Sequence, residues 1–419
     1  MASRHQPLQA PIMDLMIANV DGSGERILVK RPRTTAMFYA AWSPDGQAIA
    51  FAGTDVPGEG HLLTVSPVDG SVHSIYTTQS AIGRALWLPD GSGLLTVIFT
   101  QGRGQLWYVS YPSGEAKRVT NDLTDYPLDA LDLTRDGKSL VTVENAISSN
   151  LWVVADGDAS HARQITSGKT AARDISAGPE RTIVFVNQKD DVYSIHEDGS
   201  AMTLLTTRMH GNGNPSVCRD GRHIVFESTS DGQKNIWRMD ADGSHVTQLT
   251  QSGNAISPVC SPDSQSVQYF DVMKNWRIPI DGGTPVQVDL KDLATVLSSY
   301  SPDGKLMAYD EFGPGGDVPI QIAVIPATGG EPIYRFPLRG DANLERLHWT
   351  PDGAGLDYFL TNNGVGNIWR QPVPKGPPRQ VTNFTSDRIF SFDWSSDGKQ
   401  LYVARGSIAS DIVLITNFR

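Results

Sequence analysis

A short phrase recurs along the chain at a nearly fixed interval, and this repetition constrains the fold more than any other feature. Its first copy is Trp42-Ser43-Pro44-Asp45-Gly46, which is followed by the apolar run 48–51. The aspartate of the phrase returns at Asp90, Asp136, Asp220, Asp263, Asp303, Asp352 and Asp397. Self-similarity with a period of roughly 40 to 50 residues indicates one supersecondary unit copied many times.

A ninth copy is hidden in the one gap of this series. The step from Asp136 to Asp220 is about twice the usual one. The run 181–185, which follows Gly178-Pro179, fills the gap as a degenerate copy. The sequence therefore predicts nine repeated units.

Each unit is expected to hold four short strands. Ser-Pro-Asp-Gly suits a type I turn, because Pro fixes φ at the second position and Gly fits the fourth. Two apolar runs around such a turn read as a β-hairpin. A second phrase, as in Asn235-Ile236-Trp237, starts a third strand, and a third phrase, as in Gln248-Leu249-Thr250, ends a fourth.

Four-stranded units repeated around a ring are the blades of a β-propeller. We therefore expect an all-β fold: a single propeller of antiparallel blades, nine by repeat count, with eight blades or a split into two rings as alternatives. Residues 14–18 and 25–28 resemble the second half of a blade, and residues 392–403 resemble a first half. We expect the N-terminal strands to complete the last blade, with a tail at 1–13 and one propeller domain over 14–419.

The residues of the repeat are expected to be structural. Aspartates in turns bond to their own backbone, and tryptophans at fixed places in strands suit packing between blades, including Trp87 and Trp349. The structural repeat residues are Trp42, Asp45, Gly46, Trp107, Trp152, Trp237, Asp303, Gly304, Trp369 and Trp394.

Composition narrows the possible partners. The formal net charge is −11, which argues against a nucleic-acid binder, since such proteins carry a basic face. Cys218 and Cys260 are expected to be buried free thiols, with a disulfide as the less favoured reading. The 419 residues contain no apparent signal peptide or membrane span. We expect a cytoplasmic monomer without metal or cofactor, or an extracytoplasmic location if the chain is part of a longer membrane protein.

The three phrases together resemble the TolB-like or WD40-like repeats, also called PD40 repeats, over nearly the whole chain. The ending from Phe390-Ser391-Phe392 through 411–415 resembles the propeller tails of bacterial serine/threonine kinases and winged-helix regulators. This resemblance implies binding to another protein or sensing of a ligand. The chain has no kinase catalytic sequence, Walker A loop, GxSxG elbow or HExxH motif.

The predicted function is therefore a non-enzymatic scaffold that docks a protein, a peptide or a cell-wall fragment. In a four-stranded blade, the connections opposite the phrase turns lie on one face of the disc, and here they are long and diverse. Variable loops on a rigid scaffold often carry function. The candidate binding residues on this face are Arg208, His210, Glu311, Asp341, Arg346, Asp387 and Arg388.

Two alternatives remain open. Some propellers of this general type are metal-dependent enzymes that cleave acidic polysaccharides, so a lyase or hydrolase is one alternative; the scattered histidines argue against it. The other is a sensor tail detached from a kinase or a transcription regulator.

Overall fold

The computed structural model describes residues 13–31, 36–56, 59–100, 103–120, 124–168, 172–207, 209–271, 274–290, 298–312, 319–338, 346–416 and 418. Apart from two single-turn 3₁₀ segments, Ala159–His161 and Pro179–Arg181, the described elements are β-strands. No helix in these ranges is long and apolar enough to cross a membrane. The chain divides into two compact units, which we call the stacked unit (1–146 with 408–419) and the ring unit (147–407).

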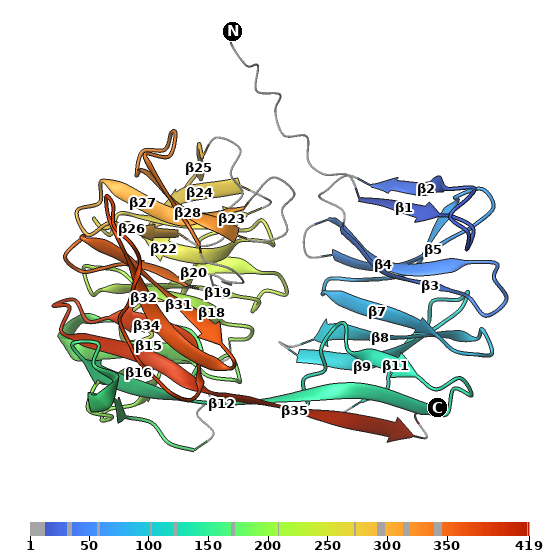
Figure 1. The fold of residues 1–419 in the computed structure, drawn as a ribbon, viewed down its shortest axis with the longest axis horizontal. Helices are drawn as coiled ribbons and strands as arrows, with labels where there is room; N and C mark the ends of the chain where they lie inside the picture. The colour runs from blue at the N-terminus through green and yellow to red at the C-terminus, as the bar shows by residue number, and fades with distance from the viewer. Residues whose placement is uncertain are drawn as a thin grey trace, which may run out of the picture. The chain divides into compact units, whose positions relative to one another are not determined.

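The ring unit contains five four-stranded antiparallel sheets that are continuous in sequence (Figure 1). The first two sheets are β14 (Ile175–Ala177), β15 (Thr182–Val186), β16 (Val192–His196) and β17 (Thr203–Leu204), and then β18 (Gly213–Val217), β19 (His223–Ser228), β20 (Asn235–Asp240) and β21 (Thr247–Gln248). The third sheet is β22 (Ile256–Cys260), β23 (Ser266–Asp271), β24 (Lys274–Pro279) and β25 (Val286–Val288). The last two are β26 (Ser298–Tyr300), β27 (Leu306–Phe312), β28 (Pro319–Pro326) and β29 (Tyr334–Pro337), and then β30 (Leu347–Trp349), β31 (Gly355–Asn362), β32 (Val365–Pro372) and β33 (Arg379–Gln380). A sixth sheet joins β34 (Arg388–Trp394), β35 (Gln400–Thr416), β12 (Ser139–Ala155) and β13 (Arg163–Gln164).

Hydrogen bonds between neighbouring sheets close these six sheets into a ring. Backbone N–H groups of one first strand donate to serine hydroxyls of another, as Ile175 N does to Ser391 Oγ at 3.1 Å. The same bond joins Val217 to Ser176, Cys260 to Ser216 and Trp349 to Ser299. The remaining junctions use Tyr300 Oη, which donates to Gln268, and the Trp394 indole, which donates to Asp357.

Two unusually long strands account for the closure. In an ordinary blade a hairpin separates the second strand from the third, but β12 and β35 each run for 17 residues without one. The run Ser139–Ala155 contains neither proline nor glycine to turn the chain. In β35, Gly406 allows a close approach, because a Cβ there would overlap the backbone of Ser148 and Ser149 in β12. Each strand thus serves as a second strand in one unit and as a third strand in the other.

The all-β propeller of four-stranded blades is confirmed, and the degenerate copy at 181–185 forms the β14–β15 hairpin as predicted. The predicted closing strands are wrong in one respect. β34 and β35 are joined by β12 and β13, whereas β1 (Met13–Ile17) pairs with β2 (Arg26–Arg31). Of the nine hairpins between first and second strands in the described residues, six lie in the ring unit and three begin in the stacked unit. The alternative of two rings is not what the structure shows, since the described sheets of the stacked unit follow one another in a row. The predicted tail at 1–13 lies almost wholly outside the described residues.

The stacked unit consists of consecutive sheets that pack face to face (Figure 1). They are β1 and β2; β3 (Ala36–Trp42), β4 (Ile49–Val56), β5 (Glu59–Val65) and β6 (Val72–Thr78); β7 (Ile82–Trp87), β8 (Gly93–Thr100), β9 (Arg103–Ser110) and β10 (Ala116–Arg118); and β11 (Leu131–Leu133) with the adjoining parts of β12 and β35. Buried residues such as Ala50, Leu94 and Leu140 fill the spaces between the sheets.

The turn aspartates act within their own turns, as expected. Asp45 Oδ1 accepts hydrogen bonds from Ser43 Oγ at 2.6 Å and from the N–H of Gln47 at 3.0 Å. Gly46 has φ of +69°, which favours glycine. The Ser43 hydroxyl and the Gln47 N–H hold the pKa of Asp45 below its ordinary value. Asp303 and Asp352 make the same contacts with Ser301 and Thr350.

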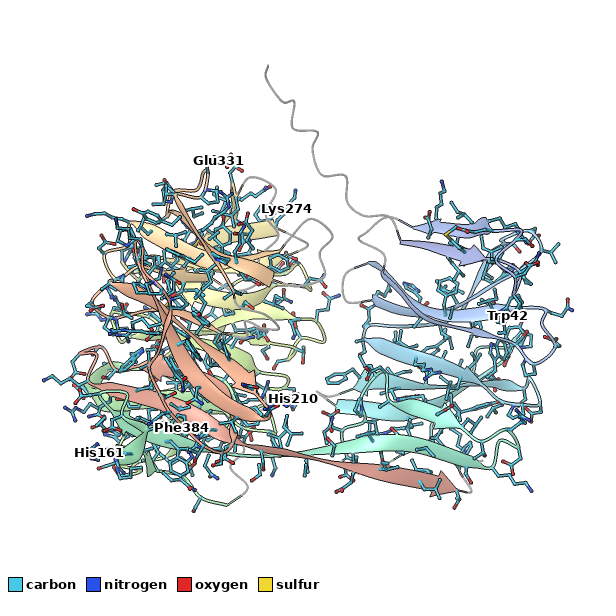
Figure 2. The ribbon with its side chains drawn as sticks, in the orientation of Figure 1. Trp42, His161, His210, Lys274, Glu331 and Phe384 are labelled. Carbon is cyan, nitrogen blue, oxygen red and sulfur yellow. A yellow bond between two sulfur atoms is a disulfide. The ribbon has the colours of Figure 1, made fainter. Side chains whose placement is uncertain are left out.

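Most of the repeat tryptophans pack between sheets, but Trp42 does not. Trp87, Trp349 and Trp394 are buried, and each indole N–H donates to the preceding sheet, as Trp87 does to Ala41 O at 3.1 Å. Trp42 (labelled in Figure 2) is 51% exposed, which contradicts the expectation of burial. Among the described residues, the preceding sheet consists of β1 and β2, and no described first strand covers this indole ring.

A threonine in the third phrase locks the fourth strand onto the third. The buried N–H of Ile236 donates to Thr250 Oγ1 at 2.9 Å, and Thr250 Oγ1 donates to Asn235 Oδ1 at 3.1 Å. Five sheets share the bond from the backbone N–H to the threonine hydroxyl, with the threonines Thr120, Thr166, Thr206, Thr250 and Thr382. The lock explains why the second and third phrases recur together.

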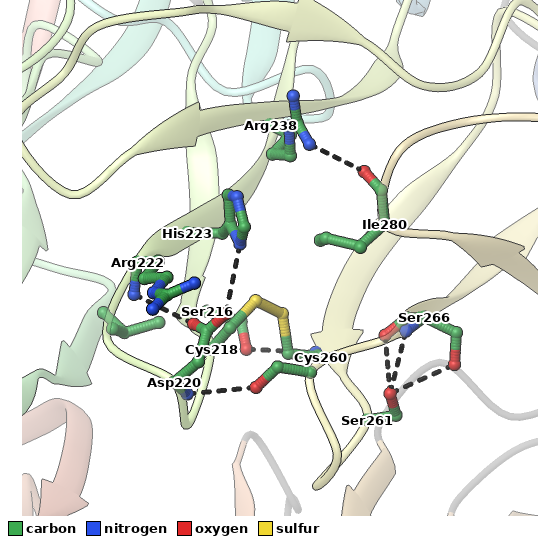
Figure 3. Close-up of a disulfide and its surroundings, with 12 residues drawn as sticks. Ser216, Cys218, Asp220, Arg222, His223, Arg238, Cys260, Ser261, Ser266 and Ile280 are labelled. Carbon is green, nitrogen blue, oxygen red and sulfur yellow. Dashed lines mark hydrogen bonds and ion pairs between the residues drawn. A yellow bond between two sulfur atoms is a disulfide. The ribbon is translucent and has the colours of Figure 1, made fainter.

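Cys218 and Cys260 form a disulfide, so the expectation of free thiols is wrong (Figure 3). The bond joins the segment after β18 to the end of β22, with a Cα–Cα distance of 5.2 Å that lies in the usual range. The two cysteines stand at different offsets from their turns, yet both come at the same ends of adjacent first strands. The disulfide therefore links neighbouring blades beside the centre of the ring.

We predict that Thr250→Val lowers the free energy of unfolding of the ring unit by about 1–3 kcal/mol, because the buried N–H of Ile236 loses its acceptor. Urea unfolding measures the change. Thr247→Val is the matched control, since Thr247 is exposed and its hydroxyl bonds to His245 O. Equal losses in both variants would contradict a specific role for the lock.

Reduction of the disulfide should lower the free energy of unfolding by about 2–4 kcal/mol, since the bond closes a long loop in the unfolded chain. The sequence separation of the two cysteines is 42 residues. Urea unfolding with and without reductant measures this loss. The double variant Cys218→Ser/Cys260→Ser should not respond to reductant, and an unresponsive native protein would count against the bond.

Candidate functional site

The first strands of the six ring sheets surround a central cavity of about 540 Å³. Its lining comes from residues 175–179, 214–219, 257–262, 298–302, 346–351 and 393–396. Along each first strand, alternate residues face this cavity. The residues that face the cavity therefore form two layers. In each first strand, one layer takes the residue four positions before the turn aspartate or its equivalent, and the other takes the residue six positions before it.

Arg346 holds three sheets together at the layer six residues before the turns. Its guanidinium donates to Asp174 Oδ1 at 2.5 Å and to Asn214 Oδ1 at 2.8 Å. Arg346 directly precedes β30, Asp174 directly precedes β14, and Asn214 lies in β18. A single side chain thus connects sheets that are not adjacent, and it reaches across the cavity at this end.

Asp174 also contacts a second cationic side chain, that of Arg173. Arg173 lies 3.3 Å from Asp174 Oδ2 and 2.5 Å from Asp190 Oδ1, and it donates to Asn212 O. Burial raises the pKa of Asp174, but the charges of Arg346 and Arg173 outweigh this effect and hold the pKa below its ordinary value. The carboxylate is therefore ionised at neutral pH.

The buried carboxylate of Glu227 extends this group of charges. Glu227 Oε1 accepts from Asn214 Nδ2 at 3.1 Å, and Oε2 accepts from the N–H of Ser257 at 3.2 Å. Lys234 Nζ lies 3.5 Å from Oε1. We call Arg173, Asp174, Asn214, Glu227 and Arg346 the Arg346 cluster.

The layer four residues before the turns contains hydroxyls, one imidazole and one carboxylate. Ser176, Ser216 and Ser299 accept backbone N–H bonds from the next first strand, which leaves each hydroxyl hydrogen available for another acceptor. His348 Nδ1 lies 3.6 Å from Asp393 Oδ1. Burial lowers the pKa of His348 although Asp393 opposes this effect, so the ring is neutral at pH 7.

A second arginine reaches across the turn end of the cavity. Arg219, which follows β18, donates to the carbonyl oxygen of Pro302 in the turn after β26. Arg346 and Arg219 therefore restrict the two ends of the channel. Within the described ranges, no group of three or more His, Cys, Asp or Glu side chains is arranged to hold a metal ion.

The five predicted binding residues that the structure describes lie at the loop end of the ring, but most of them do not contact one another. Arg208 and Asp341 lie outside the described residues. His210 (labelled in Figure 2) precedes β18, and its N–H donates to Ser230 Oγ. Glu311 accepts from Arg335 at 3.0 Å.

Two of the remaining candidates stand beside the closing sheet. Asp387 lies 3.2 Å from Arg405, and Arg388 begins β34. Of the five candidates that the structure describes, Arg346 is the one that joins charged and polar groups of three sheets.

The sequence reasoning missed Asp174, Asn214 and Glu227. Asp174 precedes the degenerate copy, where no clear phrase marks the repeat. A signal does exist, because a polar residue stands six positions before the turn in several copies, including Asn214, Ser257 and Arg346. Aligning the copies on their turns would have shown that these residues share one layer.

No family model matches the chain. An uncharacterized protein of Agrobacterium fabrum is 33% identical over 173 residues, which are 41% of this chain and 47% of that protein. The Tol-Pal system protein TolB of Francisella tularensis subsp. tularensis is 23% identical over 270 residues, which are 58% of this chain and 60% of TolB. The chain thus spans about half of the length of the curated relatives it matches.

Solved structures also resemble parts of the chain, at low sequence identity. TolB from Acinetobacter baumannii has a TM-score of 0.41 at 13% identity and covers 86% of this chain and 81% of its own. A chain of the nidogen/laminin complex has a TM-score of 0.45 at 11% identity and covers 63% of this chain and 98% of its own. With the repeated phrases and the four-stranded sheets, the curated TolB similarity identifies this chain as a TolB-like β-propeller.

Proposed function

We propose that the ring unit is a binding module that docks a protein or peptide on its loop face, around the Arg346 cluster. The observation that carries this proposal is the contact of Arg346 with Asp174 and Asn214 from two other sheets. This contact fixes charged groups of both signs at the centre of the face.

The energetic argument rests on preorganisation. A partner that binds fixed groups does not have to order them, so less of the interaction energy is lost on association. Charges held in a defined pattern favour partners with the complementary pattern and disfavour others. The side chains of Asp174 and Arg346 are only 16% and 19% exposed, so a partner would meet the cluster mainly through its rim.

The curated relatives support a docking role by analogy. The TolB proteins are named for the Tol-Pal system, and we extend to this chain only the idea of a propeller that works with another protein. The non-enzymatic role and the cytoplasmic location predicted from the sequence stay predictions, and the relatives add nothing to either.

The docking face can be tested by affinity capture from cells that make this protein. We expect His210→Ala/Arg388→Ala on the loop face to lower the recovery of specific partners by about fivefold or more, since a few residues carry most binding energy. The matched control is Arg222→Ala/Lys399→Ala in the phrase turns, where both side chains are exposed. Equal recovery by both variants would contradict docking on this face.

The free energy of unfolding of the ring unit should depend on pH through Asp174. Its folded pKa lies below the ordinary value of 3.8, so its contribution is complete above that value and is lost as the pH falls through the folded pKa. Asp174→Asn should cost about 2 kcal/mol at pH 7, because two cations lose their partner. The difference from the native protein should shrink below about pH 4.

Urea unfolding at pH 7 and at a series of acidic pH values measures this difference. Asp281→Asn is the matched control, since Asp281 also contacts an arginine, Arg238, but is 83% exposed. A cost that stays constant down to the lowest pH would contradict the assignment.

A further inference from the structure

The stacked unit leaves one sheet incomplete. Its sheets β3–β6 and β7–β10 have four strands each, but its last sheet has a first strand in β11, a second in β12 and a third in β35. β34 flanks the far edge of β35 only as far as Gly406. Among the residues that the structure describes, no strand pairs with that edge from Ile408 to Thr416.

This open segment has the sequence of a third strand. Asp411-Ile412 corresponds to Asp191-Val192 and to Asn235-Ile236 in complete sheets. The aliphatic residue of the pair is fully buried in each complete sheet that carries the threonine lock: Leu106, Leu151, Val192, Ile236 and Ile368. Ile412 is instead 80% exposed and Leu414 is 62% exposed. Leu106, the counterpart of Ile412, is buried by the sheet packed on its face, so the exposure of Ile412 and Leu414 marks an uncovered face of β35, and the open edge is a separate observation.

The segment is held in place on its other edge. Ser410 Oγ donates to Asn145 Oδ1 of β12 at 2.7 Å, and Ile415 packs against the buried cluster that contains Leu131 and Leu140. The edge is therefore a fixed strand with free backbone groups, and such an edge can accept a further strand. It carries neither lysine nor proline, which often protect exposed edges.

The neighbouring sheet shows which strand would fit. There the end of β10 and the two residues after it supply Arg118-Val119-Thr120 beside Gln105-Leu106. Arg118 Nη2 donates to Gln105 Oε1 at 2.8 Å, and Thr120 Oγ1 donates to the same oxygen at 2.9 Å. The N–H of Leu106 donates to Thr120 Oγ1 at 3.1 Å.

In β35 the position of Gln105 is taken by Asp411. A carboxylate accepts both of these bonds and adds attraction for the arginine. We propose that the edge from Ile408 to Thr416 is a docking site for an extended segment of a partner protein. The segment carries the pattern arginine, aliphatic residue, threonine, and it adds as the fourth strand by β-augmentation. This site lies in the stacked unit and does not depend on the function proposed for the ring unit.

The probe is a labelled synthetic peptide with the sequence of residues 115–120, which is the fourth strand of the neighbouring sheet. We expect saturable binding to the full chain in a fluorescence anisotropy titration. A peptide with valine in place of its threonine should bind about fivefold more weakly, because one hydrogen bond to the N–H of Ile412 is lost. Hydrogen exchange should show that the peptide protects the amide of Ile412.

Protein variants give a second measurement. Ile412→Pro removes the edge N–H and should abolish binding, whereas proline is tolerated on edge strands. Asp411→Asn is the matched control, since Asn235 fills this position in a complete sheet. It should retain binding with a weaker dependence on salt. The peptide pair keeps the proposal testable if Ile412→Pro does not fold.

Three results would overturn the proposal. The first is a lack of saturable binding, and the second is equal binding of the threonine and valine peptides. The third is protection of the Ile412 amide that rises with protein concentration in the absence of peptide, which would assign the edge to a second copy of this chain.

Discussion

The ring depends on hydrogen bonds between the first strands of neighbouring sheets. Each sheet satisfies its own backbone through its ladder, but the sheets themselves are joined mainly by apolar side chains, which do not fix a register. The register between neighbouring sheets is fixed by serine hydroxyls, which accept hydrogen bonds from the N–H groups of Ile175, Val217, Cys260 and Trp349. Because these bonds lie beside the central cavity, they also hold its wall in a defined geometry.

The charges at the loop end of the cavity follow from the same constraint. Asp174 and Asn214 stand two residues before Ser176 and Ser216 on the same strands, so the bonds that fix these serines also fix the charged and polar groups. Buried ions are costly unless they are paired. Asp174 meets this condition with two arginines, and Glu227 with Lys234, Asn214 and the N–H of Ser257. The cluster is thus a product of the scaffold and does not require a flexible loop to assemble.

The sequence predicts what is local and misses what depends on long-range pairing. The turn around Asp45 and the hairpin at 181–185 are encoded within a few residues, and both are confirmed. The pairing of β12 with β35 joins segments far apart in the chain, and no short pattern specifies it. Trp42 shows the same limit, since its exposure depends on what the preceding sheet lacks. Asp174 was missed because its importance lies in the distant Arg346.

The two halves of β35 show how strongly burial depends on what packs on each face of a sheet. From Leu401 to Ala404 the side chains are fully buried, because alternate residues belong to clusters on opposite faces of the strand. Ile412 and Leu414, on the same strand, are mostly exposed, although Ile415 on the opposite face packs against a buried cluster. A fourth strand would pair with the edge of β35 and would leave most of that outer face open. The backbone hydrogen bonds of the edge and the threonine lock would therefore decide which strand fits.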